Sequence, residues 1–306
     1  MITLNSDAAS TSLSKTTKAI LNEYGIKLNK NLGQNYLIDR NKRDQIIQFG
    51  NLTKDDVVLE IGPGIGTLTI ELAKRVKKVI AIEQDSNICQ ILENRLKKEN
   101  IDNVELINDD ALNVEFPKFD KIISNLPYQI SSPITFKFLN YDFQLAILMY
   151  QKEFASRMNG KVGSKDYSRL SAMLYFKCDV DLLTGVSAES FIPKPKVDST
   201  VVRLTPKLPE LNGQLKHLNI NEINEKDFKT YSKFVKALFQ HRNKKVKNAL
   251  IDSRHIITDL DKKEVKAKLN SIKQNKIEKL LSERITNLTP EEILYLSIHL
   301  NSALKE

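Results

Sequence analysis

Residues Asn125, Leu126, Pro127 and Tyr128 form a tetrapeptide whose residue types suit recognition of a heteroaromatic amine. The side chain of Asn125 carries an amide oxygen, and Pro127 restricts the backbone of Leu126 and so orients its carbonyl. When an exocyclic amine attacks a methyl group, its lone pair becomes localised on nitrogen. Two acceptors that receive hydrogen bonds from the N–H groups of the amine favour this localised form. Tyr128 offers a flat face for stacking on a base. Taken alone, the tetrapeptide fits a plain strand-ending turn equally well.

A glycine-rich turn is the second feature that could do chemistry. The stretch "LEIGPGIGTLT" places Gly62, Gly64 and Gly66 between a predicted strand and a predicted helix. Glycines there permit a tight turn and let the backbone approach a ligand closely. Glu83 ends the next predicted strand, 21 residues after Gly62, where a carboxylate can hold both hydroxyls of a ribose. The pattern therefore predicts a nucleoside-containing cofactor.

The spacing of the glycines indicates which cofactor. The dinucleotide pattern requires glycine or alanine where Thr67 stands, whereas E-x-G-x-G-x-G from Glu60 to Gly66 is typical of S-adenosyl-L-methionine enzymes. That cofactor has no pyrophosphate, so it needs no helix N-terminus aimed at phosphate. Asp110, in "NDDAL", could accept a hydrogen bond from its adenine amino group. One of Asp109 and Asp110 could instead only cap the next turn.

The elements that must position these groups alternate between strand and helix, which predicts a parallel sheet covered by helices on both faces. We expect an α/β, Rossmann-like class I methyltransferase sheet, in which the fourth strand lies beside the first and Asn125 faces the cofactor. Two last strands without a helix between them could add an antiparallel edge. The expected strands are 56–63, 78–85, 104–111, 121–128, 143–151, 179–187 and 199–206, and the helices among them are 66–76, 87–99 and 133–140.

The strand signal stops after a Pro- and Gly-containing linker at 205–217. Residues 1–205 are predicted to be the cofactor-binding catalytic domain, and residues 206–306 a small all-α domain. Residues 206–306 hold 20 Lys and Arg against 13 Asp and Glu, whereas residues 1–205 hold 27 against 25. A basic C-terminal part predicts a polyanionic partner, with a solvated Lys-rich surface as the alternative. The helices expected there are 226–252, 261–271, 275–285 and 289–304.

Two groups of lysines are candidates for contacting the phosphate backbone of a nucleic acid. At about 100° per residue, a continuous helix over 228–250 would place five lysines on one face. Two more lysines follow Phe191 in "FIPKPKVDS". Backbone-directed lysines would give affinity and salt dependence with little sequence reading. The candidate residues are Lys194, Lys196, Lys229, Lys233, Lys236, Lys244 and Lys247.

Composition argues against other classes of site. The two cysteines, Cys89 and Cys178, belong to no C-x-x-C pair and only four histidines occur, so we expect no structural metal site and no disulfide framework. No apolar run approaches the ~20 residues of a membrane span. The N-terminus lacks the pattern of a secretory signal, and a cytoplasmic location is expected.

The chain resembles the KsgA family of ribosomal RNA adenine dimethyltransferases, which are relatives of the Erm methylases. The matching segments occur in the family's order and span nearly the whole chain, which makes them far more specific together than any one of them. They are "NLGQNYLID" (31–39), "LEIGPGIGTLT" (59–69), "IEQD" (82–85), "NDDAL" (108–112), "SNLPYQISSPI" (124–134), "MYQKEFASRM" (149–158), "FIPKPKVDSTVVRL" (191–204) and "FQHRNKKVKNAL" (239–250). Tyr36 stands where the family usually has phenylalanine.

The resemblance implies roles for particular residues. Phe191 would pack on a flipped adenine opposite Tyr128, or would simply pack in the core. Asn125 would contact both cofactor and target. The residues implied to hold the cofactor are Gln34, Asn35, Leu37, Gly62, Gly64, Glu83, Asp110 and Asn125.

The activity implied by the resemblance is S-adenosylmethionine-dependent dimethylation of N6 on two adjacent adenines. The target would be a loop near the 3′ end of small-subunit rRNA within an immature ribosomal subunit, with no metal or membrane involved. Because a base inside a helix cannot reach the pocket, the adenine must be flipped out or taken from a loop. Alternatives are an Erm-type large-subunit methylase, a non-catalytic assembly factor, and a DNA adenine or protein glutamine methylase.

Overall fold

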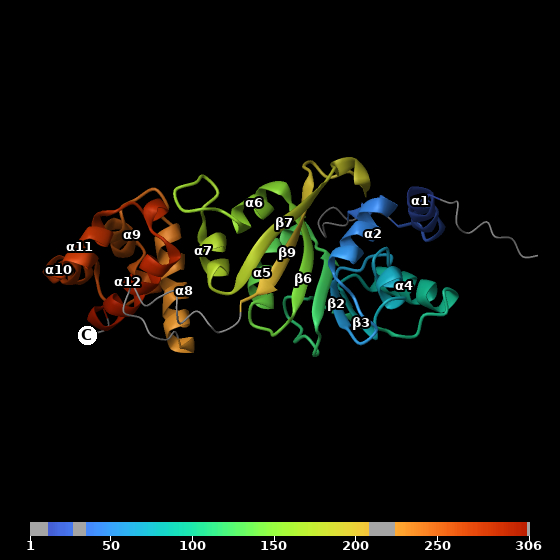
Figure 1. Ribbon diagram of the computed structural model, residues 1–306, viewed down its shortest axis with the longest axis horizontal. Coiled ribbons are helices and arrows are strands. Elements are labelled where there is room, and N and C mark those ends of the chain that lie inside the picture. Colours follow the sequence, from blue (N-terminus) through green and yellow to red (C-terminus); the bar gives the residue numbers. More distant parts are fainter. Residues whose placement is uncertain (1–11, 27–34, 208–223, 305–306) are drawn as a thin grey trace, which may run out of the picture. The chain divides into compact units, whose positions relative to one another are not determined.

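The structure is a computed structural model that describes residues 12–26, 35–207 and 224–304 (Figure 1). The chain divides into two compact units. The first unit contains Met1–Ala155 and Asp181–Pro206, and the second contains Ser156–Val180 and Lys207–Glu306. The chain therefore enters the second unit twice, whereas the sequence suggested a single boundary near residue 205.

A seven-stranded sheet forms the centre of the first unit, in the order β4-β3-β2-β5-β6-β9-β7. The pairs β3–β4, β2–β3, β2–β5 and β5–β6 are parallel, and β9 lies antiparallel to β6. The expected class I methyltransferase sheet with an antiparallel edge is confirmed. The strands are β2 (Val57–Ile61), β3 (Lys78–Glu83), β4 (Val104–Asn108), β5 (Lys121–Asn125), β6 (Leu145–Gln151), β7 (Cys178–Val186) and β9 (Ser199–Pro206).

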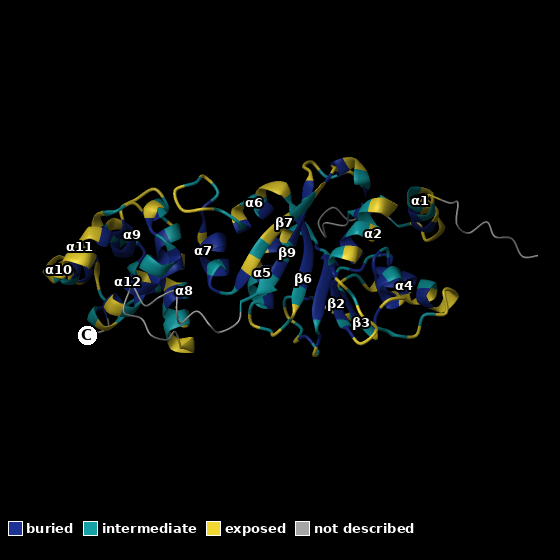
Figure 2. Ribbon diagram, in the orientation of Figure 1, coloured by how far each residue is buried: buried dark blue, intermediate teal, exposed yellow. Residues whose placement is uncertain are grey.

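The inner strands β2, β3, β5 and β6 are almost continuously buried, because a parallel sheet covered on both faces requires apolar side chains on both sides of each strand (Figure 2). Helices α3 (Thr69–Ala73) and α4 (Ser86–Lys98) pack against β3 and β4. The Asp85 side chain caps α4 by accepting from the backbone N–H of Asn87 at 2.9 Å. Helix α5 (Ser131–Phe138) connects β5 with β6.

The sequence did not indicate a small second sheet near the glycine turn. Strand β1 (Tyr36–Leu37) pairs antiparallel with β8 (Phe191–Ile192), so that Leu37 lies opposite Phe191. Helices α1 (Leu13–Glu23) and α2 (Arg40–Phe49) flank β1 along the chain. A two-residue strand has no periodicity to detect, and its partner lies more than 150 residues away in the sequence.

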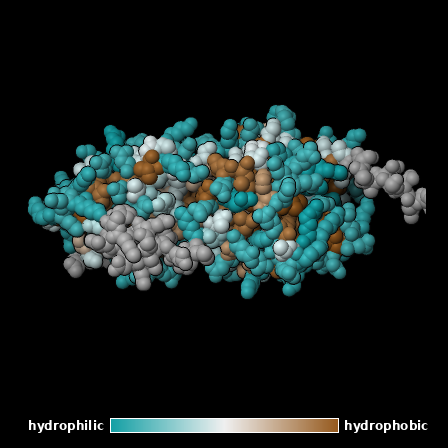
Figure 3. Space-filling view, in the orientation of Figure 1, coloured by the Kyte–Doolittle hydropathy of each residue, from teal (hydrophilic) through white to brown (hydrophobic). Residues whose placement is uncertain are grey.

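Helices make up most of the described part of the second unit. The buried Tyr231 hydroxyl donates to the Ala172 carbonyl at 2.7 Å, which joins α8 to α7. Thr289 and Glu292 form a capping box at the start of α12. Hydrophilic residues cover most of the visible face over α9, α10 and α11 (Figure 3). The helices are α7 (Arg169–Tyr175), α8 (Glu225–Phe239), α9 (Val246–Asp252), α10 (Lys262–Ser271), α11 (Asn275–Ser282) and α12 (Pro290–Ala303), and α6 (Lys152–Met158) begins in the first unit.

The expected continuous helix over 226–252 is wrong. Helix α8 ends at Phe239, and α9 begins at Val246. The backbone between them pairs elsewhere: the Val246 N–H donates to the Glu283 carbonyl at 2.9 Å, and the Ile285 N–H donates to the Lys244 carbonyl at 3.2 Å. Lys244 and Lys247 therefore do not share a helix face with the lysines of α8.

No helix among the described residues is long and apolar enough to cross a membrane. In the same part of the chain, no group of three or more His, Cys, Asp or Glu side chains is placed to hold a metal ion.

Candidate active site

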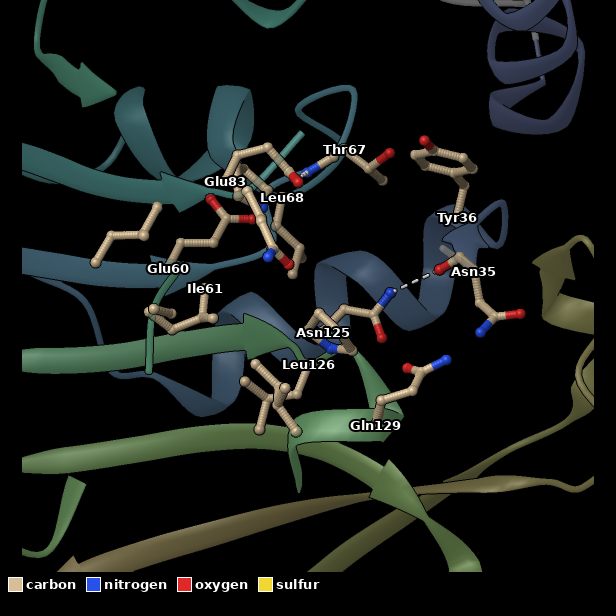
Figure 4. Close-up of a pocket in the computed structure, with 18 of the residues that line it drawn as sticks. Asn35, Tyr36, Glu60, Ile61, Thr67, Leu68, Glu83, Asn125, Leu126 and Gln129 are labelled. Atoms are coloured by element: carbon tan, nitrogen blue, oxygen red, sulfur yellow. Dashed lines mark hydrogen bonds between the residues drawn. The ribbon is translucent and has the colours of Figure 1, made fainter. Parts of the chain in front are cut away.

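A pocket of about 1050 Å³, partly open to solvent, lies where β2, β3 and β5 reach their carboxyl ends. The glycine turn, the end of β5 and the short strand β1 all contribute to its lining (Figure 4). Ligands of open parallel sheets bind at this edge of the strands. The pocket therefore brings together the two sequence features expected to do chemistry.

The glycine turn makes close contact with the segments on either side of it. Gly62 has a φ of +68°, and a Cβ there would lie 3.0 Å from Cγ of Pro127. Gly64 has a φ of +55°, and a Cβ there would lie 2.9 Å from Cε1 of Tyr36. Both the left-handed backbone and the lack of space require glycine at these positions. Through Gly62, the turn positions the ring of Pro127.

Replacing Gly62 with alanine is expected to destabilise the protein by about 2 kcal/mol, because it adds a steric contact to an unfavourable backbone conformation. Displacement of Pro127 should also weaken binding of S-adenosylhomocysteine by about tenfold, a loss of about 1.4 kcal/mol. Urea unfolding and calorimetric titration measure the two effects. Gly25→Ala is the control, since Gly25 also has a positive φ of +58° but nothing lies within 4 Å of its Cβ position. Equal effects of the two substitutions on affinity would contradict this interpretation.

Two carboxyl groups lie inside the pocket. Glu60 is 1% exposed and one of its oxygens, Oε2, has no hydrogen-bond partner among the described residues. Burial raises the pKa of Glu60 to about 8, and the neighbouring charge of Glu83 acts in the same direction. Glu83 accepts from the backbone N–H groups of Asp85 at 3.1 Å and Gly64 at 3.2 Å, yet burial still raises its pKa. The pocket therefore holds acidic groups suited to a ligand with hydroxyls and positive charge.

Asp110 lines the pocket and also caps the turn after β4. Its Oδ1 accepts from the Leu112 N–H at 2.9 Å, and Oδ2 accepts from Nδ2 of Asn113 at 3.3 Å. Asp109 accepts from the Asp110 N–H at 2.7 Å. Both aspartates therefore cap the turn, which is the role that the sequence analysis gave as the alternative to cofactor binding. The contact of Asp110 with a cofactor stays a prediction.

Asn125 is held in place by the N-terminal segment. Its Nδ2 donates to the Asn35 carbonyl at 3.0 Å, and Figure 4 shows the amide oxygen on the side that faces away from Asn35. Leu126 and Pro127 line the pocket next to Asn125. The arrangement leaves the Asn125 oxygen available as an acceptor for an amine.

The two aromatic residues expected to hold the target base do not line the pocket. Tyr128, in the short 3-10 helix Tyr128–Ile130, forms a hydrogen bond of 2.5 Å with the Ser199 hydroxyl. Burial raises the pKa of Tyr128, so its phenol stays protonated. Phe191 is 2% exposed and packs in a core cluster with Leu37, as the core-packing alternative describes. Base stacking by Tyr128 and Phe191 stays a prediction that requires their rings to become accessible.

The N-terminal residues expected to hold the cofactor fall into two groups. Asn35 and Leu37 line the pocket, whereas Gln34 lies outside the described residues. Tyr36, Gln129 and Ile130 also line it but were not singled out as site residues from the sequence. Their contribution depends on the pairing of β1 with β8 and on the 3-10 turn, neither of which has a sequence signal.

The candidate RNA-binding lysines lie on different elements, and all of them are exposed except Lys247, which is half-buried. Lys229, Lys233 and Lys236 share the exposed face of α8, where Lys229 pairs with Glu225 at 2.9 Å. Lys244, between α8 and α9, pairs with Asp252 at 2.7 Å. Lys247 on α9 donates to Asn270. In the first unit, Lys194 pairs with Glu189, and Lys196 is exposed.

Comparisons with known proteins identify the family. Residues 25–286 match the sequence model of the family described as "Ribosomal RNA adenine dimethylase". The chain belongs to the ribosomal RNA adenine dimethylase family. A protein of Methanosphaera stadtmanae named "Probable ribosomal RNA small subunit methyltransferase A" is 48% identical, over 94% of this chain and 99% of the relative. A protein of the same name from Methanothermobacter thermautotrophicus is 44% identical over 93% and 95% of the two chains.

Solved structures agree with this family assignment. A dimethyladenosine transferase from Plasmodium falciparum has a TM-score of 0.69 and 30% identity, and covers 87% of this chain and 98% of its own. The 23S rRNA methyltransferase ErmE has a TM-score of 0.58 and 26% identity, with coverage of 87% and 99%. The resemblance expected from the sequence is confirmed, and this family member is an rRNA adenine dimethyltransferase whose methyl donor is S-adenosyl-L-methionine.

The pocket fits that cofactor on its own geometry. Gly62 and Gly64, both with positive φ values, leave two positions without side chains in the turn at the end of β2. The carboxyl groups of Glu60 and Glu83 suit a molecule that carries a sulfonium, an ammonium and a ribose diol. Glu83 and Asp110 lie at the ends of neighbouring strands β3 and β4, where the sequence analysis expected ribose and adenine.

Proposed function

We propose that this enzyme dimethylates N6 of two adjacent adenines in a loop near the 3′ end of small-subunit rRNA. The observation that carries the proposal is the position of Asn125 and Leu126 in the wall of the cofactor pocket, beside the glycine turn. The names of the relatives from Methanosphaera stadtmanae and Methanothermobacter thermautotrophicus point to small-subunit rRNA as the target.

The chemistry assigned to this corner is the orientation of an amine. Bound S-adenosylmethionine supplies an electrophilic methyl group on a sulfonium sulfur. The Asn125 oxygen and the Leu126 carbonyl accept hydrogen bonds from the two N–H groups of the adenine amine. These two hydrogen bonds localise the lone pair on the amine nitrogen. The Asn35 carbonyl prevents the Asn125 amide from turning, because it accepts the hydrogen bond from Nδ2. Placing the nitrogen within reach of the methyl group supplies much of the rate, and no metal or covalent intermediate is required.

A second methylation makes a further demand on the same corner. The monomethylated amine keeps one N–H, so one of the two acceptors must be dispensable, or the base must rotate between the two transfers. The partly open pocket next to Leu126 and Gln129 is where the first methyl group would have to fit.

The proposal extends to the setting of the reaction. We infer that the substrate is an immature ribosomal subunit in the cytoplasm, in which an unpaired loop adenine can enter the pocket. The exposed lysines of α8 would bind the phosphate backbone without reading sequence. Lys194, Lys196, Lys244 and Lys247 would add further backbone contacts.

Incubation with labelled S-adenosylmethionine and four separate substrates tests the proposed function. The substrates are immature small subunits, free small-subunit rRNA, free large-subunit rRNA and double-stranded DNA, each digested afterwards to map labelled adenines. We expect dimethyladenine at two adjacent positions of small-subunit rRNA. Label confined to large-subunit rRNA would support the Erm-type alternative, and label in DNA alone would exclude an RNA target.

Replacing Lys233 and Lys236 with alanine is expected to weaken rRNA binding and to reduce the slope of log K against log salt by about 2, because each lysine neutralises about one phosphate. Affinity for S-adenosylhomocysteine should not change. The matched control is Lys97→Ala with Lys98→Ala, which removes two exposed lysines from α4. Filter binding at four salt concentrations measures the slopes, and equal slopes for the two double variants would contradict an RNA-binding role of α8.

A further inference from the structure

Tyr36 places a buried hydroxyl group beside the cofactor pocket, and the proposed mechanism gives this hydroxyl no role. The residue is 5% exposed and lines the pocket, and its hydroxyl has no hydrogen-bond partner among the described residues. Buried polar groups in folded proteins nearly always have a partner, so each exception requires an explanation.

The aromatic ring has a structural role that does not need the hydroxyl. It packs against the backbone of Gly64, where even a Cβ would lie 2.9 Å from Cε1. Phenylalanine would cover the glycine turn in the same way. Burying a hydroxyl without a partner costs free energy that phenylalanine would avoid, so the packing of the ring does not explain why tyrosine is present.

The surroundings of the hydroxyl define its chemistry. Burial and the charges of Glu83 and Asp85 raise the pKa of Tyr36, so the phenol keeps its proton and acts as a donor. Its ring lies on Gly64, whose N–H donates to Glu83 at 3.2 Å. Tyr36 thus brings a donor to the region where the Glu83 carboxylate supplies acceptors.

We propose that the Tyr36 hydroxyl donates a hydrogen bond to a ribose oxygen of the bound cofactor. The inference rests on the assignment of Glu83 to the ribose in the proposed site. A ribose hydroxyl that donates to the Glu83 carboxylate keeps lone pairs on its oxygen, and Tyr36 supplies the matching donor. Glu83 then accepts the hydrogen bond that this ribose hydroxyl donates, and Tyr36 donates a hydrogen bond to the oxygen of the same hydroxyl.

Tyr36→Phe separates this role from a purely structural one, because it removes one oxygen and keeps the ring over Gly64. Two effects of opposite sign are expected. The melting temperature of the ligand-free protein should rise by about 3 °C, since a buried unpartnered group is removed. The Kd for S-adenosylhomocysteine should increase about tenfold in calorimetric titration.

A second ligand locates the contact within the cofactor. Methylthioadenosine has the ribose and adenine but lacks the amino-acid part, so a ribose contact predicts a similar increase in its Kd. Tyr24→Phe is the control, because Tyr24 is 40% exposed and does not line the pocket. Unchanged affinity of Tyr36→Phe for both ligands would overturn the inference, as would a loss confined to S-adenosylhomocysteine. A wild-type protein that binds neither ligand would instead count against the cofactor site itself.

Discussion

Replacing Asn125 with alanine is expected to lower the rate of methyl transfer at saturating cofactor by about 10²- to 10³-fold. Removing one preorganised polar contact to a developing charge has an effect of this size in other enzymes. The variant loses the oxygen that accepts the amine N–H. It also loses the 3.0 Å hydrogen bond to the Asn35 carbonyl, so the end of β5 is no longer tied to the N-terminal segment.

Single-turnover methylation of small-subunit rRNA measures this effect without a contribution from product release. Asn87→Ala is the matched control, since Asn87 is an exposed amide on α4 away from the pocket. The affinity of the Asn125 variant for rRNA should remain within about threefold of that of the wild type. The reason is that the proposed RNA-binding lysines, and not Asn125, provide most of the binding free energy. A variant that retains more than about a tenth of the wild-type rate would count against the Asn125 acceptor role.

The free energy of unfolding of the ligand-free protein is expected to fall as the pH rises from about 5 to about 8. The cause is Glu60, whose pKa is higher in the folded than in the unfolded state. Between the usual pKa of 4.5 and the folded-state pKa of about 8, the unfolded state releases the Glu60 proton while the folded state keeps it. The unfolded state is therefore favoured increasingly until both states are ionised above pH 8. The contribution is on the order of 5 kcal/mol, at ~1.4 kcal/mol per pKa unit.

Glu60→Gln isolates this contribution because glutamine is neutral at every pH. Urea unfolding at pH 5.5, 7.0 and 8.5 should show a smaller decline for the variant than for the wild type, with the largest difference at pH 8.5. Glu93→Gln, on the exposed side of α4, controls for the loss of a carboxylate elsewhere. Parallel pH dependence of the wild type and Glu60→Gln would mean that Glu60 is ionised in the folded protein.

A cationic ligand in the pocket should favour the ionised form of Glu60, whereas the ligand-free pocket favours the protonated form. Positive charge near a buried carboxyl lowers its pKa, so binding of S-adenosylmethionine near neutral pH should release a fraction of a proton. Calorimetric titration in buffers of different ionisation enthalpy detects that proton. The released fraction should be smaller for Glu60→Gln.

The arrangement of the sheet could be predicted from the sequence because local signals determine it. Strands that alternate with helices form a parallel sheet, and this arrangement predicts that Asn125 lies beside the glycine turn. The parallel pair β2–β5 and the contact between Gly62 and Pro127 bear this out. Glu83 likewise ends β3, next to β2, as the spacing indicated.

The parts that could not be predicted depend on contacts between distant residues. The pairing of Tyr36 with Ile192 brings β1 to the pocket and also buries Phe191, although neither segment has a periodic pattern. The interruption between α8 and α9 arises because the backbone around Lys244 pairs with that around Ile285. The lysine spacing suggested one continuous helix, since periodicity alone does not reveal a competing backbone partner.

The structure of a complex with S-adenosylhomocysteine and adenosine is the most direct test of the central claim. We expect N6 of the adenosine at about 2.6–3.2 Å from both the Asn125 oxygen and the Leu126 carbonyl, on the side of the pocket that holds the cofactor sulfur. If the adenosine amine instead contacts other groups, or if the Asn125 amide turns its nitrogen toward the base, the proposed acceptor role of this corner is wrong.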